Sequence, residues 1–530
     1  MATPPARSYA DALALLDKLQ SNRMIVSAIS DAKRDMNLDA IPEMLDWTRK
    51  AGYEVDEFAK RGLRCLHVAG TKGKGSVCAM VDNILRQYRD SDSDVVVRES
   101  AKKGIGKIGL YTSPHLMTVR ERIRIDGAPI SETLFARYFF ELWDRFTLAA
   151  STTTTPHVDP ASYETKPGYF RYLTIMALHT FIEEGVESAI IECGIGGEYD
   201  STNILPPEAV TVSAITKLGI DHVGMLGDTV DKIAWHKAGI MKTGVPAFTV
   251  AQVPEAQALL EKRAAEKGVE LRVISRYAGF DDGSIELGAE GEFQRDNASL
   301  ATAVASSHLR SLGVENIPPP SEISSSIPDE FRLALKTIKW PGRCEVIVDN
   351  NIDWLIDGAH TPDSILQTRL WWNSKLQQAR EQGRLPTKTI LIFNQQDRDP
   401  RPLLQILLRH EVMTVAHASQ PLFPTLDMGL FTFAGFCTNT PFREDVKGTG
   451  EELLKQQKIA KEMYAQLDKN QLAMEYGSVE EAVELVRRVA VDEERVFVLC
   501  TGSLHLVGGL MKVLEREKMR KGLGGGEKGE

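Results

Sequence analysis

The chain has 530 residues, of which 43% are hydrophobic and 26% are charged, with a formal net charge of −10 and a pI near 5.7. This composition is typical of globular proteins and allows two or more buried cores, while the acidic balance argues against a general nucleic-acid-binding protein. The six cysteines show no CxxC spacing, which argues against a zinc site or a disulfide framework and favours reduced thiols in the cytoplasm.

The amino-terminal sequence MATPPARSYADALALLDKLQ contains no secretory apolar core. Asp11 and Asp17 weaken its interpretation as a mitochondrial transit peptide, although a mitochondrial form stays open. No run reaches the roughly 18 apolar residues of a membrane span. We therefore expect a cytoplasmic protein without stable membrane insertion, and nothing in the sequence indicates an obligate dimer.

The first part of the chain predicts helices followed by a strand–turn–helix unit. Residues 9–60 are expected to be helical, because their apolar residues recur at helical spacing. LRCLHVAG at 63–70 predicts a short buried strand that runs into glycines, and SVCAMVDNILRQYR at 76–89 predicts a helix with one apolar face. Strand, glycine-rich turn and helix in this order form the context in which a phosphate-binding loop works.

The turn itself departs from the usual spelling of a phosphate loop. Only two residues separate Gly70 from Gly73, and Gly75 stands between Lys74 and Ser76. Backbone N–H groups from Gly73 to Ser76 are expected to cradle phosphate oxygens, with Lys74 as the point charge for a transferring phosphate. For this stretch taken alone, a tight structural turn is the alternative interpretation.

Further strand–loop–helix units follow along the chain. Strands are predicted in KIGLYTSPH (107–115), VESAIIECGIGG (186–197), AVTVSAITKLGIDHVGMLG (209–227) and VPAFTV (245–250), and a helix capped by Asp228 is predicted at 228–242. This alternation predicts an α/β domain with a mostly parallel sheet. Two polar insertions, at 89–106 and 150–168, are expected to be surface loops.

A Pro- and Ser-rich stretch between about residues 313 and 340 predicts a domain boundary. New strand–loop–helix units follow it at 353–372, 389–410 and 495–514. We therefore expect an amino-terminal domain at 1–335 and a smaller α/β domain at 336–520. The final stretch, KGLGGGEKGE at 521–530, is expected to be a disordered tail.

Polar residues follow several of the predicted strands. In open α/β sheets ligands bind at the carboxyl ends of the strands, so Ser113, Glu192 and His222 are expected near the phosphate loop. A carboxylate with a hydroxyl and an imidazole could hold Mg²⁺, although histidine is an unusual ligand for a hard cation and each residue alone has a structural alternative. Cys193 has no His or Asn pattern that would make it a nucleophile, and is expected to be buried.

Together these motifs resemble the eukaryotic folylpolyglutamate synthases of the Mur ligase superfamily over nearly the whole chain. The resemblance rests on the following stretches: HVAGTKGKGS, YTSPHL, VRERIRIDG, IECGIGGEYDSTN, GIDHVGMLGDT, HKAGIMK, WPGR and DGAHTPDS. It implies a Mur-ligase-like ATP-binding domain followed by a Rossmann-like α/β domain. It also implies ATP-dependent addition of L-glutamate in γ-linkage to reduced folates through an acyl phosphate, with Mg²⁺ as cofactor and K⁺ as a monovalent activator.

The resemblance also assigns roles to individual residues. The nucleotide would be bound by Gly73, Lys74, Gly75, Ser76, Asn297, Arg343, Asp357 and His360. Mg²⁺ would be held by Ser113, Glu192 and His222, since Ser76 is displaced by one position from the usual hydroxyl. Lys237 matches a lysine that is carbamylated in related ligases and helps to hold a second metal, whereas without the family a salt-bridged helix lysine would be favoured. The catalytic candidates are Lys74, Lys237 and His222.

The sequence bears on three alternative functions. Dihydrofolate synthase uses the same nucleotide chemistry with dihydropteroate as the acceptor, and it is the nearest alternative. A UDP-muramyl ligase would need a separate amino-terminal UDP-binding domain, but the phosphate loop already begins at residue 70. A GTPase switch would need Asn-Lys-x-Asp after a strand, and TKLGID at 216–221 lacks that pattern.

Overall fold

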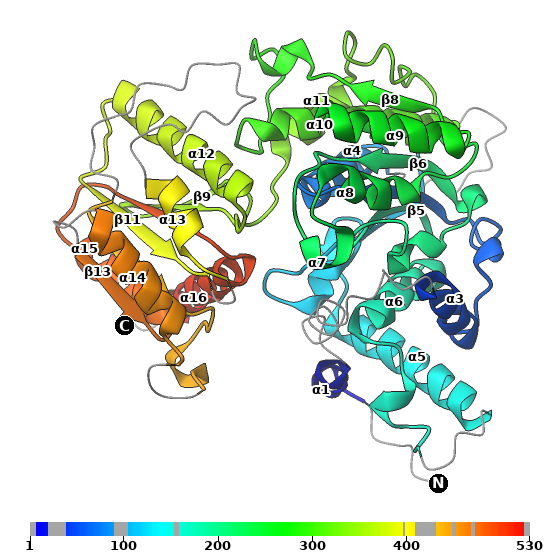
Figure 1. Ribbon diagram of the computed structural model, residues 1–530, viewed down its shortest axis with the longest axis horizontal. Helices are drawn as coiled ribbons and strands as arrows, with labels where there is room; N and C mark the ends of the chain where they lie inside the picture. Colours follow the sequence, from blue (N-terminus) through cyan, green and yellow to red (C-terminus); the bar gives the residue numbers. More distant parts are fainter. Residues whose placement is uncertain are drawn as a thin grey trace, which may run out of the picture. The chain divides into compact units, whose positions relative to one another are not determined.

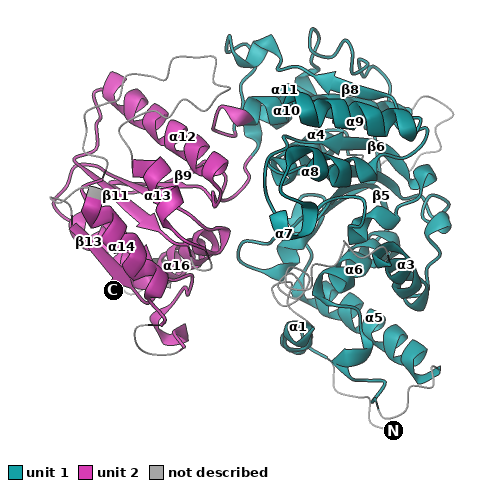
Figure 2. Ribbon diagram, viewed as in Figure 1, with its two compact units in different colours: residues 1–288, 294–338 teal, residues 289–293, 339–530 magenta. Residues whose placement is uncertain are grey.

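The structure is a computed structural model that describes residues 7–19, 39–89, 104–152, 158–395, 398–408, 431–447, 452–467 and 472–523. The chain divides into two compact units, each of which is considered by itself (Figure 2). The first consists of residues 1–288 and 294–338, and the second of residues 289–293 and 339–530. Each unit contains one β-sheet with helices packed against it (Figure 1).

The sheet of the first unit has eight strands in the order β4-β3-β2-β5-β1-β6-β7-β8. Their bounds are β1 Arg64–Ala69, β2 Lys107–Tyr111, β3 Ile123–Ile125, β4 Ala128–Pro129, β5 Val186–Glu192, β6 Val210–Ile215, β7 Ala247–Val250 and β8 Leu271–Ile274. In the spatial order of the sheet, all neighbouring strands from β2 through β5, β1, β6 and β7 to β8 pair in parallel. Strand β3 pairs antiparallel with β2 and with β4. The central strands are buried along almost their whole length, as expected for a parallel sheet covered on both faces.

The helices of the first unit precede β1, alternate with the strands, or follow β8 in the chain. They are α1 Tyr9–Lys18, α3 Ala40–Lys50, α4 Lys74–Arg86, α5 Glu132–Thr152, α6 Tyr169–Glu183, α7 Val223–Leu226, α8 Val230–Lys237, α9 Pro254–Glu266, α10 Phe293–Ser311 and α11 Asp329–Thr337. Short 3₁₀ turns are η1 Val55–Glu57, η2 Val119–Arg122, η3 Tyr163–Thr165, η4 Ser201–Ile204, η5 Pro207–Ala209, η6 Ala238–Ile240 and η7 Ala278–Phe280. Helix α4 is buried from Ser76 to Leu85, because it packs against β1, β2, β5 and α11.

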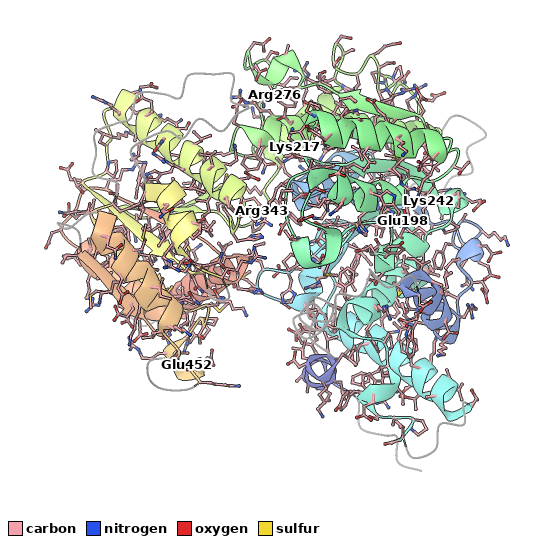
Figure 3. The ribbon with its side chains drawn as sticks, in the orientation of Figure 1. Glu198, Lys217, Lys242, Arg276, Arg343 and Glu452 are labelled. Atoms are coloured by element: carbon pink, nitrogen blue, oxygen red, sulfur yellow. The ribbon has the colours of Figure 1, made fainter. Side chains whose placement is uncertain are left out.

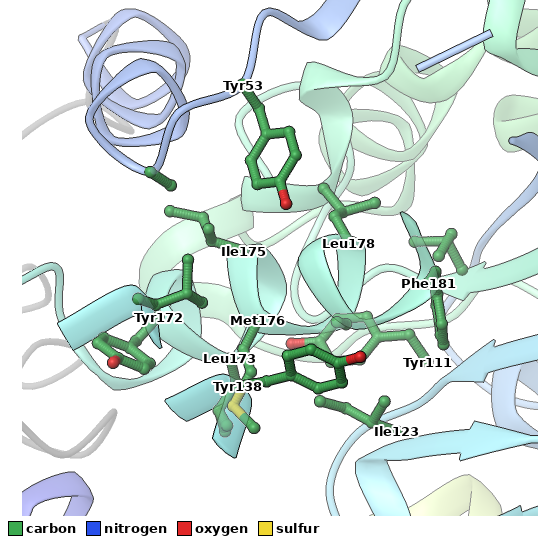
Figure 4. Packing of buried hydrophobic residues seen from close by; sticks show 14 of the residues in the cluster. Tyr53, Tyr111, Ile123, Tyr138, Tyr172, Leu173, Ile175, Met176, Leu178 and Phe181 are labelled. Atoms are coloured by element: carbon green, nitrogen blue, oxygen red, sulfur yellow. The ribbon is translucent and has the colours of Figure 1, made fainter. Parts of the chain in front are cut away.

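The largest core cluster of the first unit is rich in aromatic residues. Helix α6 runs through it and is buried from Tyr172 to Phe181 (Figure 4). On α5, the ring of Phe139 lies with its centroid 4.9 Å from that of Tyr172 and 5.6 Å from that of Trp143. This cluster therefore joins α5 and α6 to the β2–β5 side of the sheet.

The second unit contains a six-stranded sheet in the order β13-β12-β11-β14-β10-β9, parallel except for β9. The strands are β9 Glu345–Asp349, β10 Ile352–Ile356, β11 Lys388–Phe393, β12 Phe433–Cys437, β13 Leu472–Tyr476 and β14 Val496–Thr501. The helices are α12 Pro362–Glu381, α13 Arg401–Leu408, α14 Lys455–Leu467, α15 Val479–Val489 and α16 Leu504–Leu523, with the 3₁₀ turn η8 Arg443–Asp445. This unit has its own core around two buried residues of α12, Trp371 and Trp372.

One local prediction is wrong and another is confirmed. Asp228 does not cap α8, because the helix begins at Val230 with Thr229 at its N-cap, while the Asp228 carboxylate accepts a hydrogen bond from Lys232 at 2.9 Å. The helical prediction for residues 9–60 is confirmed by α1, α3 and the 3₁₀ turn η1, while residues 20–38 lie outside the described part.

The two polar insertions and the tail are described only in part. Residues 90–103, 153–157 and 524–530 lie outside the described residues, and α16 extends to Leu523. Residues 150–152 of the second insertion form the end of α5. Further along, Lys166 is only 6% exposed, and its ammonium group donates to the carbonyl oxygen of Pro160 at 2.8 Å. Lys166 and Pro167 are therefore packed into the unit, whereas residues 158, 159, 161, 163 and 164 are exposed, as predicted for a surface loop.

Candidate nucleotide and metal site

The phosphate-loop candidate connects β1 to α4 and is tied to the loop that follows β6. The backbone N–H groups of Thr71 and Lys72 donate to the carbonyl oxygen of Lys217 at 3.1 and 3.0 Å. The Thr71 hydroxyl donates to the Gly219 carbonyl at 3.0 Å and accepts from the Gly219 N–H at 3.2 Å. Lys72 also forms an ion pair with Asp221 at 3.0 Å. These bonds tie the loop to the segment that follows β6.

Gly73 precedes α4 in a left-handed conformation, with φ of +91°. A Cβ atom at this position would lie 2.4 Å from Oδ1 of Asn297, so only glycine fits there without moving that side chain. Gln294 joins the two sides of the contact: its amide donates to Oγ of Ser76 at 3.3 Å and accepts from Asn297 at 2.9 Å. All three polar side chains are buried, so the structure brings the predicted nucleotide residue Asn297 against the loop.

Two lysines converge on one carbonyl oxygen at the start of the loop. Nζ of Lys74 lies 3.1 Å from the Gly70 carbonyl oxygen, and Nζ of Lys237 lies 2.7 Å from the same atom. Lys237 is 3% exposed, and burial, followed by the nearby charge of Lys74, lowers its pKa from 10.5 to about 7. Lys74 and the protonated form of Lys237 direct positive charge at one backbone dipole, which favours the binding of a negatively charged group there.

The predicted metal residues follow strands that are neighbours in the sheet. Ser113 comes after β2, Glu192 ends β5 and His222 comes after β6, and these strands flank β1 in the order β2-β5-β1-β6. The Glu192 carboxylate is 4% exposed and accepts a hydrogen bond from the Ser113 N–H at 3.0 Å. The parallel order of the strands thus places both residues at the edge where the phosphate loop begins.

His222 stands at the N-cap of α7 in a left-handed conformation with φ of +51°. Burial lowers the pKa of its imidazole to about 4; the charge of Asp221 opposes this shift, while those of Lys74 and Lys237 add to it. The ring is therefore neutral near pH 7 and keeps a lone pair that can bind a metal. The same charges place His222 in the electrostatic environment of both lysines.

Two of the three donor types, the hydroxyl and the carboxylate, suit a hard cation that is also coordinated by phosphate oxygens, whereas the imidazole is an unusual ligand for it. Ser113, Glu192 and His222 offer a hydroxyl, a carboxylate and a neutral imidazole. Within the described part of the chain, no cluster of three or more His, Cys, Asp and Glu side chains could hold a metal ion. A cation at this edge would therefore depend on the serine hydroxyl and on oxygens that arrive with the nucleotide.

The remaining predicted nucleotide residues belong to the second unit. The Asp357 carboxylate is 6% exposed and accepts hydrogen bonds from the N–H groups of Cys344 and Ala359 at 2.9 and 3.0 Å, and from the Thr368 hydroxyl at 2.9 Å. These bonds order the turn that carries Arg343, whose guanidinium lies 2.6 Å from a Cβ built on Gly358 (Arg343 is labelled in Figure 3).

The neighbouring His360 is also held within this unit. Its ring nitrogen Nδ1 lies 3.1 Å from the carbonyl oxygen of Gly358, and its backbone N–H donates to the Ser364 hydroxyl at 3.2 Å. The structure thus brings Arg343, Asp357 and His360 together as one local group, while the phosphate loop and the metal candidates belong to the first unit.

Comparison with known proteins places this arrangement in a family. The chain is 39% identical over 518 residues to the curated folylpolyglutamate synthase of Saccharomyces cerevisiae (strain ATCC 204508 / S288c), covering 96% of this chain and 87% of the relative. The chain belongs to the folylpolyglutamate synthase family. The same identity and coverage are found with the folylpolyglutamate synthase of a second yeast strain, YJM789. No family model matches the chain.

Solved structures of the folylpolyglutamate synthase family share the fold. The Mycobacterium tuberculosis folylpolyglutamate synthase complexed with ADP has a TM-score of 0.63 at 22% identity, covering 95% of this chain and 99% of that one. A complex of FPGS with AMPPCP and folate has a TM-score of 0.62 at 22% identity, covering 96% and 99%. At this identity the likeness establishes the fold: a mostly parallel sheet followed by a second α/β sheet.

Three residues that organise the site were missed by the sequence predictions. Gln294 could have been suspected, because it lies three positions before Asn297 on one helix and so shares its face. Thr71 could have been suspected only as a member of the loop. Glu121 could have been suspected from the T-x-x-E capping-box pattern that begins at Thr118. Its carboxylate accepts from the N–H groups of residues 116, 117 and 118 at 2.9 to 3.0 Å, which orders the segment after Ser113. Among the described helices, none has the length and apolar content that a membrane span requires.

Proposed function

We propose that this chain adds L-glutamate in γ-linkage to reduced folates at the expense of ATP. The observation that carries the proposal is the 39% identity, over 96% of the chain, to a curated folylpolyglutamate synthase. A phosphate loop with two converging lysines supports it, since phosphoryl transfer needs charge neutralisation at this point.

The proposed chemistry has two steps. The terminal carboxylate of the folate attacks the γ-phosphorus of ATP, giving an acyl phosphate and ADP. The neutral amine of glutamate then attacks the acyl carbon, loses a proton, and expels phosphate as the amide forms. A carboxylate is a poor electrophile because its charge repels nucleophiles and its oxygen leaves badly, and phosphorylation removes both obstacles.

We assign the phosphate contacts to Gly73, Lys74, Gly75 and Ser76. The N-terminus of α4 directs backbone N–H groups toward the loop, and Lys74 supplies a positive charge for the phosphate in transfer. Asn297 in the first unit and the group Arg343, Asp357 and His360 in the second unit are proposed as further nucleotide-binding residues. Among these, Asp357 would act by ordering its turn, since three donors of the same unit already engage its carboxylate.

We propose Mg²⁺ as the divalent cofactor, held by Ser113, Glu192 and His222. When bound, it would neutralise charge on the phosphate oxygens. The Ser113 N–H fixes the Glu192 carboxylate by a hydrogen bond. Burial keeps the His222 ring neutral, so its lone pair is available to a cation. We also propose a monomer in the cytoplasm, with K⁺ as activator, and domains at 1–335 and 336–520.

Lys237 is proposed as a carbamylation site and a catalytic residue. Carbamate formation requires a neutral amine, and a pKa of about 7 provides a large neutral fraction near pH 7. The modification would exchange a cation facing Lys74 for an anion. Intact-protein mass spectrometry in bicarbonate should show the added carbon dioxide on wild type, and Lys237→Met should lack it.

The function is tested by mass spectrometry of reaction products. Wild type should convert tetrahydrofolate, ATP, Mg²⁺ and glutamate into species longer by one or more glutamyl residues, with one ADP per addition. Extension of dihydropteroate in place of tetrahydrofolate would instead identify a dihydrofolate synthase. ATP hydrolysis that needs neither acceptor nor glutamate would contradict both ligase functions.

Lys74→Ala tests the phosphate loop within that assay. We expect a loss of at least about a hundredfold in kcat/KM, because the cation facing the transferred phosphate is removed. Lys232→Ala is the matched control, since this lysine of α8 is 58% exposed and pairs only with Asp228 in the described structure. Near-normal ligation by a folded Lys74→Ala variant would show that the loop does not bind the reacting phosphate.

A further inference from the structure

A fully buried histidine lies in the strand that leads into the phosphate loop. His67 belongs to β1, has 0% of its surface exposed, and precedes Gly70 by three positions. Burial, with a smaller effect of Lys242, lowers the pKa of its imidazole to about 3, so the ring is neutral at any working pH (Lys242 is labelled in Figure 3). None of the roles proposed above uses this residue.

The hydrogen bonds of His67 lead away from its own strand. Nε2 lies 2.8 Å from Oγ1 of Thr202 and 3.1 Å from Sγ of Cys193, whereas Nδ1 has no hydrogen-bond partner in the described part of the chain. Oγ1 of Thr202 in turn donates to the Asp200 carboxylate at 2.7 Å. The other oxygen of Asp200 accepts from the N–H of Ile195 at 2.9 Å.

These contacts determine where the ring proton is. The Thr202 hydroxyl has a single proton, and the carboxylate of Asp200 is its strongest acceptor, because charge-assisted hydrogen bonds are stronger than neutral ones. Thr202 must therefore accept from His67, which places the imidazole proton on Nε2. The result is a directed relay that runs from His67 through Thr202 and Asp200 to the backbone of Ile195.

The relay holds the segment that immediately follows Glu192. At its start, the N–H of Cys193 donates to the carbonyl of Val68, the residue next to His67, at 2.9 Å. At its far side, the N–H of Glu198 donates to the carbonyl of His236, the residue before Lys237, at 2.6 Å. The segment from 193 to 202 is thus fixed to β1 beside the phosphate loop and to the helix that carries Lys237.

We propose that His67 is a positioning residue for the Mg²⁺–ATP site: acting through Thr202 and Asp200, it fixes the segment after Glu192 and with it the direction of the Glu192 carboxylate. This inference rests on the proposed function, in which Glu192 is a metal ligand. Mutation of residues that orient metal ligands without touching the metal typically lowers metal affinity about 10- to 100-fold. His67 touches neither substrate nor metal in this scheme.

The test measures ATP binding by calorimetry as the Mg²⁺ concentration is varied, together with steady-state ligation. His67→Leu should weaken the apparent Mg²⁺ affinity in ATP binding by about tenfold or more, while kcat at saturating Mg²⁺ falls much less. His67→Gln should restore affinity to within about threefold of wild type, because its amide can donate from the position of Nε2, whereas the shorter His67→Asn should not.

A second buried histidine provides a matched control. His308 is also 0% exposed, and its ring contacts two hydroxyls, Ser188 at 2.9 Å and Thr211 at 2.7 Å. These partners lie near the starts of β5 and β6, at the opposite end of the strands from the phosphate loop. His308→Leu should therefore lower the free energy of unfolding without changing the Mg²⁺ dependence of ATP binding.

The hydroxyl link gives a test that does not require His67 to be replaced. Thr202→Val should shift the Mg²⁺ dependence as His67→Leu does, Thr202→Ser should not, and the two damaging substitutions should be non-additive when combined. If His67→Leu does not fold, the comparison of Thr202→Val with Thr202→Ser decides the question. An unchanged Mg²⁺ dependence in the folded variants, or an equal shift in His308→Leu, overturns the proposal.

The outcomes separate this inference from the proposed function. ATP binding needs neither folate nor glutamate, so a wild-type protein that fails to extend tetrahydrofolate contradicts the substrate assignment and leaves the relay test in force. Wild-type ATP binding that does not depend on Mg²⁺ contradicts the metal assignment and overturns the relay with it.

Discussion

At the scale of single residues, the arrangement of Lys74 and Lys237 says most about the site. Both ammonium groups point at the Gly70 carbonyl oxygen, and Lys237 is buried, so their mutual repulsion is poorly screened. A protein gains no stability from two such charges at one point. The arrangement is instead explained by a ligand that brings negative charge, as the phosphates of ATP do.

The depressed pKa of Lys237 predicts a pH-dependent effect on stability. Between about pH 7 and 10 the unfolded chain holds the lysine proton and the folded chain does not, so stability rises with pH in this range. Below about pH 7 both states hold the proton, and burying the charge costs on the order of 5 kcal/mol. Lys237→Met removes this cost, so its stability relative to wild type should fall as the pH rises from about 7 to 10.

Urea unfolding at several pH values measures this difference. Lys232→Met, at an exposed position of the same helix, is the control and should show no comparable fall. A difference between Lys237→Met and wild type that stays constant over this pH range would contradict the depressed pKa.

At the scale of secondary-structure elements, the β1–loop–α4 unit sets the geometry of the site. The loop starts at the carboxyl end of a central strand, and α4 is buried nearly all round beneath it. Its backbone shape depends on the left-handed Gly73, and that residue leaves space for Asn297 of α10. The loop is therefore shaped as much by a distant helix as by its own glycines.

Gly73→Ala should separate backbone strain from loss of binding when compared with Gly62→Ala. Both glycines have similar φ values, +91° and +87°, but a Cβ meets Asn297 at the first position and nothing within 4 Å at the second. Gly62→Ala should therefore lower stability by about 1–2 kcal/mol, and Gly73→Ala by at least as much, because it also displaces the buried Asn297 side chain. Only Gly73→Ala should also weaken ATP binding, by at least about tenfold, because it displaces Asn297.

Chemical denaturation and calorimetric titration with ATP provide the two measurements. Equal ATP affinity in the two alanine variants would mean that the contact between Gly73 and Asn297 has no part in nucleotide binding.

At the scale of the whole molecule, each of the two units has its own sheet and its own core. The core of the first unit depends on aromatic packing, in which Phe139 is fully buried and its ring contacts those of several neighbours. The second core is built around tryptophans of α12. Separate cores predict that damage to one unit lowers the stability of that unit first.

Phe139→Ala tests this expectation. Removal of a fully buried ring should lower the free energy of unfolding of the first unit by about 3–5 kcal/mol. Leu148→Ala on the same helix, at a side chain that is 68% exposed, should change it by no more than about 0.5 kcal/mol. Hydrogen exchange resolved by peptide should show faster exchange in α5 and α6 and unchanged exchange in β10 and β14. Equal acceleration in both units would show that they unfold together.

Much of the site could be predicted from local sequence. Apolar runs followed by glycines or polar residues marked the strands, and because parallel strands end at one edge, Ser113, Glu192 and His222 were expected near Lys74. The same strand patterns predicted the α/β class with a second sheet, and this prediction was confirmed. The helix cap at Asp228 was wrong, since Asp228 and Thr229 are both good capping residues and local sequence does not choose between them.

What the sequence alone determined was therefore the kind of elements, the loop at the end of β1 and the family. The tertiary structure decided the rest: which strands are neighbours, that Lys237 is buried against Gly70, that Gln294 joins Ser76 to Asn297, and that His67 reaches Thr202. The physical reason is that these contacts join residues far apart in the chain. Local periodicity carries the direction of a side chain but not the partner it meets, and the partner sets burial, pKa and hydrogen bonding.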